Sequence, residues 1–347
     1  MTEEKVLIVS GKGMVSVKNE CLKIQKTFLK KGYACDFVLY QEISPRRTPN
    51  PRYSLTIWFT PLLPMYMPIQ RLWLRREKTD LCVSYYVIEG IVHGIKPYLR
   101  WLRWQYIATP SKFVKSNLEE MGIPVREIIP HQLTDPMPIN LTYGYKWRSR
   151  LPKNKRILLY VGSQIERKGL PKLNEAIKIL SKRRNDFIMV YHTDNVKNPY
   201  HTPIEKLDAP NTVVETDFGR IGLPEVYAKM YFSDFIVHPA LTEGFGLPIL
   251  EALALGKPLV CVNAYGVNEI ANPKNSFMVT EVKPSTLKFW NTVTFKIMDY
   301  SPEALADKID EALSSTKEEL EAKITAGLET TQKFKNTYQK FTKFLEK

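Results

Sequence analysis

Short apolar runs alternate with amphipathic stretches along most of this 347-residue chain, and this alternation is the feature that most constrains its fold. The first run, Lys5–Val9, has the composition of a strand buried on both faces of a parallel sheet. A helical pattern that ends at Gly32 follows it, and Cys35–Tyr40 then has the composition of a second strand. The chain therefore opens with a β-α-β unit, which is typical of α/β domains.

The same alternation restarts in the second half, after a basic, polar stretch at Tyr145–Lys155 that we interpret as a linker. Strand-like runs at Arg156–Gly162 and Asp234–His238 are interspersed with helical patterns at Leu170–Arg183 and Leu223–Met230. Strand and helix alternate in both halves, which predicts an α/β protein. We expect two doubly wound, Rossmann-like domains that face each other across a cleft.

The length agrees with two domains, since a domain contains roughly 150 residues. We place the N-terminal domain at residues 1–150 and the second domain at residues 151–316. Residues 317–347 have the periodicity of an amphipathic C-terminal helix, which we expect to be interrupted near Gly327. This helix could pack back on the N-terminal domain.

Positive charge is concentrated in the first half of the chain. Lys and Arg number 50 against 36 Asp and Glu, and residues 1–150 alone hold 23 basic and 12 acidic side chains. Such an excess suits an anionic partner, which could be nucleic acid, an acidic membrane surface or a phosphorylated acceptor. No helix-turn-helix, zinc-finger or RNP-type motif is present, so we expect no nucleic-acid partner.

Residues 71–106 interleave tryptophan and tyrosine with arginine. This composition suits the headgroup region of an anionic membrane surface. The alternative is that the tryptophans pack on the protein core while the arginines remain in water. No run approaches the ~18 apolar residues of a membrane-spanning helix, and no signal peptide is visible. We therefore expect a cytoplasmic protein that is at most peripheral to the membrane.

The four cysteines show neither the spacing of a zinc site nor that of a disulfide framework. Cys21, Cys35, Cys82 and Cys261 are scattered without a C-x-x-C pair. We interpret them as small buried hydrophobic residues in a reducing compartment.

The loop that follows the strand at Asp234–His238 has the residues of a ligand-binding turn. Gly244 and Gly246 would let the backbone approach a ligand closely, and Pro248 is suited to the first turn of a helix, where free amide groups favour phosphate. Glu243 and Glu251 flank this turn, and two carboxylates there would suit the hydroxyl groups of a sugar. The alternative is that the turn binds no ligand and that the acidic residue near the start of the helix only stabilises the helix dipole.

Glu243-Gly-Phe-Gly-Leu-Pro-Ile-Leu-Glu251 resembles the E-x7-E signature of retaining glycosyltransferases with the GT-B fold, the family 4 or group 1 enzymes. Leu159–Gly169 is similar to the loop in which that family binds the donor diphosphate. The resemblance covers roughly residues 157–280 and extends weakly into the first half. It implies a UDP- or GDP-sugar donor, a carbohydrate or lipid-linked hydroxyl acceptor, and an acceptor-side N-terminal domain.

The resemblance also implies roles for individual residues. Arg167 and Lys168 would neutralise the diphosphate, Glu243 would contact the transferred sugar, and these three would be the catalytic residues. Glu251 would bind the ribose hydroxyls. The complete donor site would comprise Gly162, Arg167, Lys168, Glu243, Gly244, Phe245, Gly246, Leu247 and Glu251.

Several positions depart from the pattern of the family or match it weakly. Gly11 and Gly13 could form the glycine loop of the first domain or a simple tight turn, and they lack the third glycine of a dinucleotide-binding fingerprint. Glu89 and His93 are weak candidates for the first-domain histidine of the family. His192 stands where the family often has a glycine pair, so the nucleobase pocket would be unusual.

The stretch at 282–300, which contains Trp290, has no counterpart that we can place, and no D-x-D triplet occurs. The missing triplet predicts metal-independent transfer with no metal site and no cofactor. The alternatives are a catalytically inactive nucleotide-sugar-binding protein and, less favoured, a basic nucleic-acid-binding protein.

Overall fold

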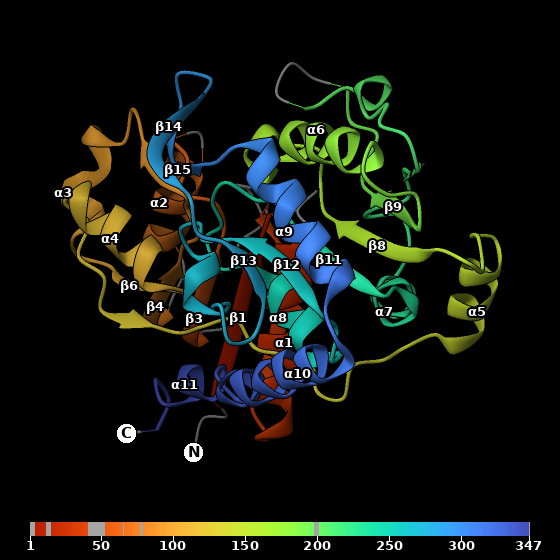
Figure 1. The fold of residues 1–347 in the computed structure, drawn as a ribbon. Coiled ribbons are helices and arrows are strands. Elements are labelled where there is room, and N and C mark those ends of the chain that lie inside the picture. The colour runs from red at the N-terminus through yellow and green to blue at the C-terminus, as the bar shows by residue number, and fades with distance from the viewer. Residues whose placement is uncertain are drawn as a thin grey trace. The chain divides into compact units, whose positions relative to one another are not determined.

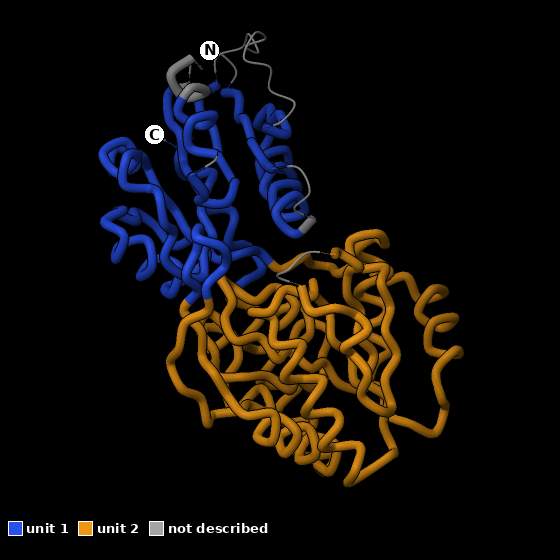
Figure 2. The backbone as a smooth tube through the Cα atoms, turned by 90° about the horizontal axis from the view of Figure 1, so that it is seen from above, with its two compact units in different colours: residues 1–132, 288–295, 334–347 blue, residues 133–287, 296–333 orange. Residues whose placement is uncertain are grey.

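The computed structural model describes residues 4–11, 15–40, 53–64, 66–76, 79–197 and 201–346. The chain divides into two compact units, which Figure 2 distinguishes by colour. Unit 1 comprises residues 1–132, 288–295 and 334–347, and unit 2 comprises residues 133–287 and 296–333. Each unit contains a six-stranded parallel sheet.

The sheet of unit 1 has the order β2-β1-β3-β4-β6-β7, and its strands are labelled in Figure 1 where there is room. The strands are β1 (Lys5–Ser10), β2 (Ala34–Leu39), β3 (Tyr53–Phe59), β4 (Thr79–Tyr85), β6 (Tyr106–Thr109) and β7 (Glu127–Ile128). The helices are α1 (Val15–Lys30), α2 (Met67–Arg76), α3 (Leu99–Leu102) and α4 (Lys112–Glu120). The N-cap of α4 is Ser111, whose hydroxyl accepts a hydrogen bond from the Val114 amide. The predicted β-α-β opening of the chain is confirmed.

The C-terminal segment belongs to both units in turn. Helix α10 (Lys317–Thr331) lies in unit 2, and the short helix α11 (Gln339–Thr342) lies in unit 1. Tyr338, Phe341 and Leu345 are buried in the hydrophobic core of unit 1, together with apolar residues of α1, β1, β3 and β4. The predicted interruption near Gly327 is wrong. The helix continues through Gly327 to Thr331, and Gly327 allows α10 to pack closely on Leu253 of α8.

The sheet of unit 2 has the order β10-β9-β8-β11-β12-β13. Its strands are β8 (Arg156–Val161), β9 (Phe187–His192), β10 (Thr212–Glu215), β11 (Phe235–His238), β12 (Leu259–Val262) and β13 (Phe277–Val279). The accompanying helices are α5 (Leu141–Ser149), α6 (Leu170–Ser181), α7 (Leu223–Phe232), α8 (Leu247–Ala254) and α9 (Pro302–Ser314). The central strands are buried along almost their entire length, as their apolar composition predicts.

The predicted linker at Tyr145–Lys155 is wrong, because its first part, Tyr145–Ser149, belongs to helix α5 and the whole stretch is part of unit 2. Asn140 caps α5, and the Trp147 indole is buried and donates a hydrogen bond to Glu215. Gly144 packs directly on Phe232 of α7. Residues 133–150, which the sequence analysis assigned to the N-terminal domain, therefore lie in unit 2.

Residues 283–299 form a hairpin. It lies within the stretch at 282–300, for which we could place no counterpart from the sequence. Strands β14 (Lys283–Phe289) and β15 (Val293–Asp299) form a small sheet with β5 (Gly90–Val92), in which β15 pairs with β5 in antiparallel register.

All four cysteines are free thiols. Cys21 and Cys261 are buried, whereas Cys35 and Cys82 are only half-buried, so the expectation of burial holds fully for two of the four. Among the residues that the structure describes, no helix has both the length and the apolar character needed to span a bilayer.

Candidate functional site

The topology of unit 2 fixes the position of the candidate site. Strand β8 lies in the middle of the sheet, β9 and β10 follow on one side of it, and β11 to β13 follow on the other. The chain thus reverses direction across the sheet between β8 and β11. In open α/β sheets, ligands bind at this switch point, beyond the carboxyl ends of the strands. The candidate site therefore lies in the loops after β8 and β11.

These two loops are bonded directly to each other. The loop after β8 continues into a short helical turn, Glu166–Lys168, and the Arg167 carbonyl accepts a hydrogen bond of 2.9 Å from the Leu241 amide of the loop after β11. Gly169 has a left-handed φ of 75°, and a side chain at this position would collide with the Pro239 carbonyl. Only glycine allows the loops to approach so closely.

This contact joins residues that lie far apart in the sequence into one buried ion cluster. Lys168 Nζ lies 2.5 Å from Glu243 Oε1, and His238 Nε2 lies 2.9 Å from the same oxygen. An Arg167 guanidinium nitrogen lies 3.6 Å from Glu243 Oε2. The cluster is nearly closed to solvent, because Glu243 is only 4% exposed. The structure thus brings together Arg167, Lys168 and Glu243, the three predicted catalytic residues.

The cluster determines the protonation state of Glu243. Burial acts to raise the pKa of its carboxyl group, but Lys168, His238 and Arg167 together hold that pKa well below its usual range. The side chain is therefore an ionised carboxylate near neutral pH. It can accept hydrogen bonds from hydroxyl groups, and it has no proton to donate as a general acid.

The glycine-rich turn leads directly into α8. Gly246 has a φ of 98° and is the N-cap residue of this helix, and Pro248 lies in its first turn. Gly244 and Phe245 are buried in the turn, and Leu247 is half-buried. A helix N-terminus has amide groups without intrahelical partners and a positive dipole end, and both favour an anion.

Glu251 lies about one turn into α8, and a neighbouring helix holds its carboxylate. The Tyr227 hydroxyl of α7 donates a hydrogen bond of 3.0 Å to Glu251 Oε1. Tyr227 is fully buried and Glu251 is half-buried. This bond fixes the orientation of the carboxylate predicted to bind ribose. At the end of β8, the Gly162 amide donates to the His192 carbonyl of β9.

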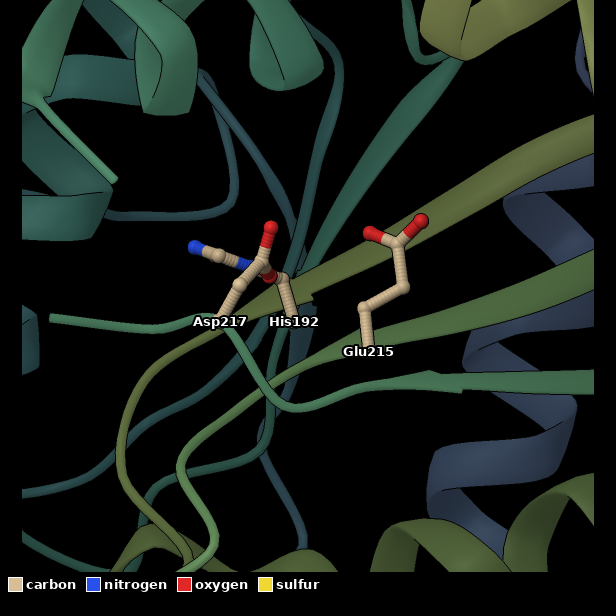
Figure 3. A group of neighbouring side chains, drawn as sticks. All are labelled: His192, Glu215 and Asp217. Carbon is tan, nitrogen blue, oxygen red and sulfur yellow. The ribbon is translucent and has the colours of Figure 1, made fainter. Parts of the chain in front are cut away.

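His192 belongs to a second polar cluster in unit 2, shown in Figure 3 with Glu215 and Asp217. The residue types could hold a metal ion, but the buried Lys229 ammonium lies among their ligand atoms. Its Nζ is 2.8 Å from Glu215, 2.9 Å from Asp217 and 3.1 Å from His192 Nδ1. Burial lowers the pKa of His192, so the imidazole is neutral near pH 7. A lysine thus supplies the positive charge that a metal would otherwise bring.

The candidate residues predicted in the first domain lie in unit 1 and are not part of the two clusters described above. Gly11 directly follows β1 and is buried, and Gly13 lies outside the described residues. Glu89 precedes β5 and is half-buried. His93 follows β5 and is bonded to the hairpin, since its Nε2 lies 2.8 Å from Thr294 Oγ1 and its amide donates to the Thr292 carbonyl.

Five residues of these sites were not predicted from the sequence: His238, Tyr227, Lys229, Glu215 and Asp217. His238 carried a usable signal, because it is the last residue of an otherwise apolar strand and directly precedes the ligand-binding loop. Tyr227 and Lys229 lie in a helix with ordinary amphipathic character, and no pattern in the sequence distinguished them.

Solved structures identify the fold as the GT-B fold of glycosyltransferases, and the predicted fold class is thereby confirmed. A glycosyltransferase from Rickettsia africae ESF-5 matches with a TM-score of 0.73 at 17% identity, over 100% of both chains. HepE from Anabaena, solved in complex with UDP and glucose, matches with a TM-score of 0.69 at 14% identity, over 99% of both chains.

Residues 145–328, more than half of the chain, match the family model of the glycosyl transferases group 1. The chain belongs to this family, as the resemblance in its sequence predicted. A relative with an assigned name is the lipopolysaccharide glucosyltransferase WaaG of Escherichia coli K12, which is 28% identical over 216 residues. The match covers 61% of this chain and 56% of that protein, so it spans little more than half of the relative.

Proposed function

We propose that this chain is a retaining glycosyltransferase that moves a sugar from a UDP- or GDP-sugar to a hydroxyl group of a carbohydrate or lipid-linked acceptor. Unit 2 would bind the donor and unit 1 the acceptor. The observation that carries the proposal is the ion cluster of Arg167, Lys168 and Glu243 at the switch point of unit 2. A relative named as a glucosyltransferase and a structural neighbour solved with UDP and glucose support a nucleotide-sugar donor.

In this proposal, the cationic pair stabilises the leaving group. Arg167 and Lys168 bind the diphosphate and balance the negative charge that develops as the bond between the sugar and the phosphate breaks. The N-terminus of α8 contributes further partial positive charge. These groups supply the charge stabilisation that a bound Mg²⁺ would otherwise give, and we propose that transfer needs neither a metal ion nor a cofactor.

The remaining residues orient the donor. Glu243, held as a carboxylate, accepts hydrogen bonds from hydroxyl groups of the transferred sugar, and Glu251 accepts them from the ribose. The new glycosidic bond forms on the face that the diphosphate leaves, and a phosphate oxygen takes the proton of the acceptor hydroxyl. No enzyme carboxylate forms a covalent bond to the sugar. His192 stays the weaker candidate for the nucleobase end of the site.

Titration calorimetry with UDP and GDP tests the donor site. We expect Lys168→Ala and Glu251→Ala each to weaken the binding of the preferred nucleotide by roughly 1–3 kcal/mol, which is about 5- to 150-fold in Kd, because each loses a charge-assisted hydrogen bond. Lys178→Ala is the matched control, since its ion pairs with Glu175 and Asp208 lie on the surface of the same unit. Unchanged affinity in both site variants would show that the donor site is assigned wrongly.

Transfer of label from UDP-[14C]glucose or GDP-[14C]mannose to a glycolipid extract tests the activity. An inactive nucleotide-sugar-binding protein would bind the nucleotide and give no labelled product. Activity that is abolished by EDTA would contradict metal independence. A product with inverted anomeric configuration, measured by NMR, would contradict retention.

We also propose that unit 1 approaches anionic membranes through residues 71–106. Trp104 is 85% exposed, and the neighbouring Arg100 and Arg103 are exposed as well. These side chains are those expected at a headgroup interface. We expect the protein to co-sediment with phosphatidylglycerol vesicles and to be released as salt screens the attraction. Absence from the pellet even at low salt would refute this proposal.

A further inference from the structure

The tip of the β14–β15 hairpin, residues 288–295, belongs to unit 1 and is paired with β5. Val293–Phe295 of β15 pair with Gly90–Val92, and a side chain at Gly90 would collide with the Thr294 backbone. His93 adds the two hydrogen bonds to Thr292 and Thr294 described above. The turn of the hairpin is therefore held in a defined position.

The turn places Trp290 in a backbone conformation that tryptophan rarely adopts. The Thr292 amide donates to the Phe289 carbonyl at 3.4 Å, so Phe289–Thr292 form a β-turn with Trp290 at its first central position. Trp290 has a φ of 49°, a left-handed conformation for which hairpin turns prefer glycine. Burial does not explain the tryptophan either, because its side chain is 52% exposed. Strain of this kind, held by a rigid surrounding structure, is typical of functional positions.

The exposed indole is supported from behind by a column of aromatic rings. Trp290 stacks on Phe289 with ring centroids 5.4 Å apart and an interplanar angle of 20°. The ring centroids of Phe289 and Phe295 are in turn 5.6 Å apart, and Phe295 is buried. The column anchors the indole, and the hairpin thus presents a flat aromatic ring whose orientation is fixed.

The tip of the hairpin belongs to unit 1. Residues 288–295 are part of this unit, in which β15 pairs with β5. The aromatic turn is therefore carried by the unit that we propose to bind the acceptor.

We propose that Trp290 is a stacking platform for a hexopyranose ring of the acceptor, an assignment that rests on the proposed transferase function. The C–H groups of a sugar ring carry partial positive charge and pack on the negative face of an aromatic ring. The strand that leads to the turn favours a sugar over a lipid, because β14 exposes four polar side chains, Lys283, Ser285, Thr286 and Lys288, and one proline, Pro284. A single oriented ring at the end of a largely polar strand suits one sugar unit.

Direct binding can be observed with 5-fluorotryptophan and 19F NMR on the full chain. The protein has six tryptophans, and the Trp290 signal is identified by its loss in Trp290→Phe. The probes are the methyl α-glycosides of D-glucose, D-mannose and D-galactose. We expect at least one of them to shift the Trp290 signal saturably while the signal of the more exposed Trp104 stays in place. A Trp290 signal that responds to none of the three, or that responds only to phosphatidylglycerol vesicles, would overturn the proposal.

Trp290→Gly separates a binding role from a structural one. Glycine relieves the strain at this φ, so we expect a melting temperature equal to or above that of the wild type together with loss of saturation transfer from the protein to the glycoside. If Trp290→Gly still shows saturation transfer to the glycoside in the NMR experiment, whether or not its melting temperature is lower, the platform is refuted. UDP calorimetry on the wild type keeps the two proposals apart. If UDP binds and no glycoside does, only the platform fails, and if UDP does not bind, the proposed function fails.

Discussion

Glu243→Gln is the substitution that tests the ion cluster most directly, because it removes one charge and almost no volume. The carboxylate is 4% exposed and lies between Lys168, Arg167 and His238. Removing one partner of a buried ion pair costs about 3–5 kcal/mol. Both cations retain some contact with water, since their side chains are 15% exposed. We therefore expect the free energy of unfolding to fall by about 2–4 kcal/mol.

The same substitution should affect binding and transfer in opposite ways. The amide leaves the positive charges of Lys168 and Arg167 unbalanced, and they can then attract a diphosphate at least as strongly as in the wild type. The transferred sugar loses its carboxylate partner, so the transfer rate should fall. We expect UDP affinity to be unchanged or higher, while the transfer rate falls by about 10-fold or more. This fall corresponds to the free energy of one charge-assisted hydrogen bond. Calorimetry and the labelled-sugar assay measure the two quantities separately.

Urea unfolding across pH provides the matching stability measurement. The folded-state pKa of Glu243 is depressed, so its contribution to stability is fully present above the pKa of the unfolded chain, about 4.3, and is lost as pH falls below that value. The stability difference between the wild type and Glu243→Gln should thus be constant near neutral pH and shrink in acid. A difference that is absent at pH 7, or a UDP affinity that falls as far as the transfer rate, would refute the reasoning.

Two further substitutions test the neighbouring contacts. Lys229→Met leaves the half-buried carboxylates of Glu215 and Asp217 without their cation. Because both carboxylates retain contact with water, we expect urea unfolding to show a loss of about 2–4 kcal/mol; an unchanged midpoint would contradict the role of this ammonium. Tyr227→Phe removes the hydrogen bond to Glu251, and calorimetry should show UDP binding weaker by about 0.5–1.5 kcal/mol at unchanged folding stability. Unaltered UDP affinity in Tyr227→Phe would separate Glu251 from the nucleotide.

The sequence was sufficient to predict features that depend on local patterns. Buried parallel strands such as β1 and β8 appear as continuous apolar runs, and the helical pattern at Leu170–Arg183 corresponds to α6. The boundary between the units was not predictable in this way. Residues of α5 are basic and polar enough to suggest a linker, yet Trp147 and Gly144 fix this helix to unit 2 through contacts with distant segments.

The candidate site shows the same division. The carboxylates, glycines and cationic pair were recognisable from spacing, but their mutual contacts depend on the strand order β8-β11, which brings together residues 75 positions apart. His238 and Tyr227 act only through Glu243 and Glu251, so their importance depends on geometry that no local pattern contains. The hairpin of Trp290 lies in the stretch for which we could place no counterpart from the sequence, and its pairing with β5 depends on a contact across about 200 positions.

The paired state of Glu243 has a consequence for the binding of an anionic donor. Two cations held close together without an anion would repel each other, and in this structure the carboxylate balances them. A diphosphate would take over part of this role, so its attraction to Lys168 is offset by a weaker bond between Lys168 and Glu243. If the site binds a diphosphate as proposed, the net electrostatic gain on binding would be smaller than two bare cations would give, and the nucleotide left after transfer would dissociate more readily. The released carboxylate oxygen would then accept a hydrogen bond from the sugar, so this one ion pair would couple binding of the diphosphate to recognition of the sugar.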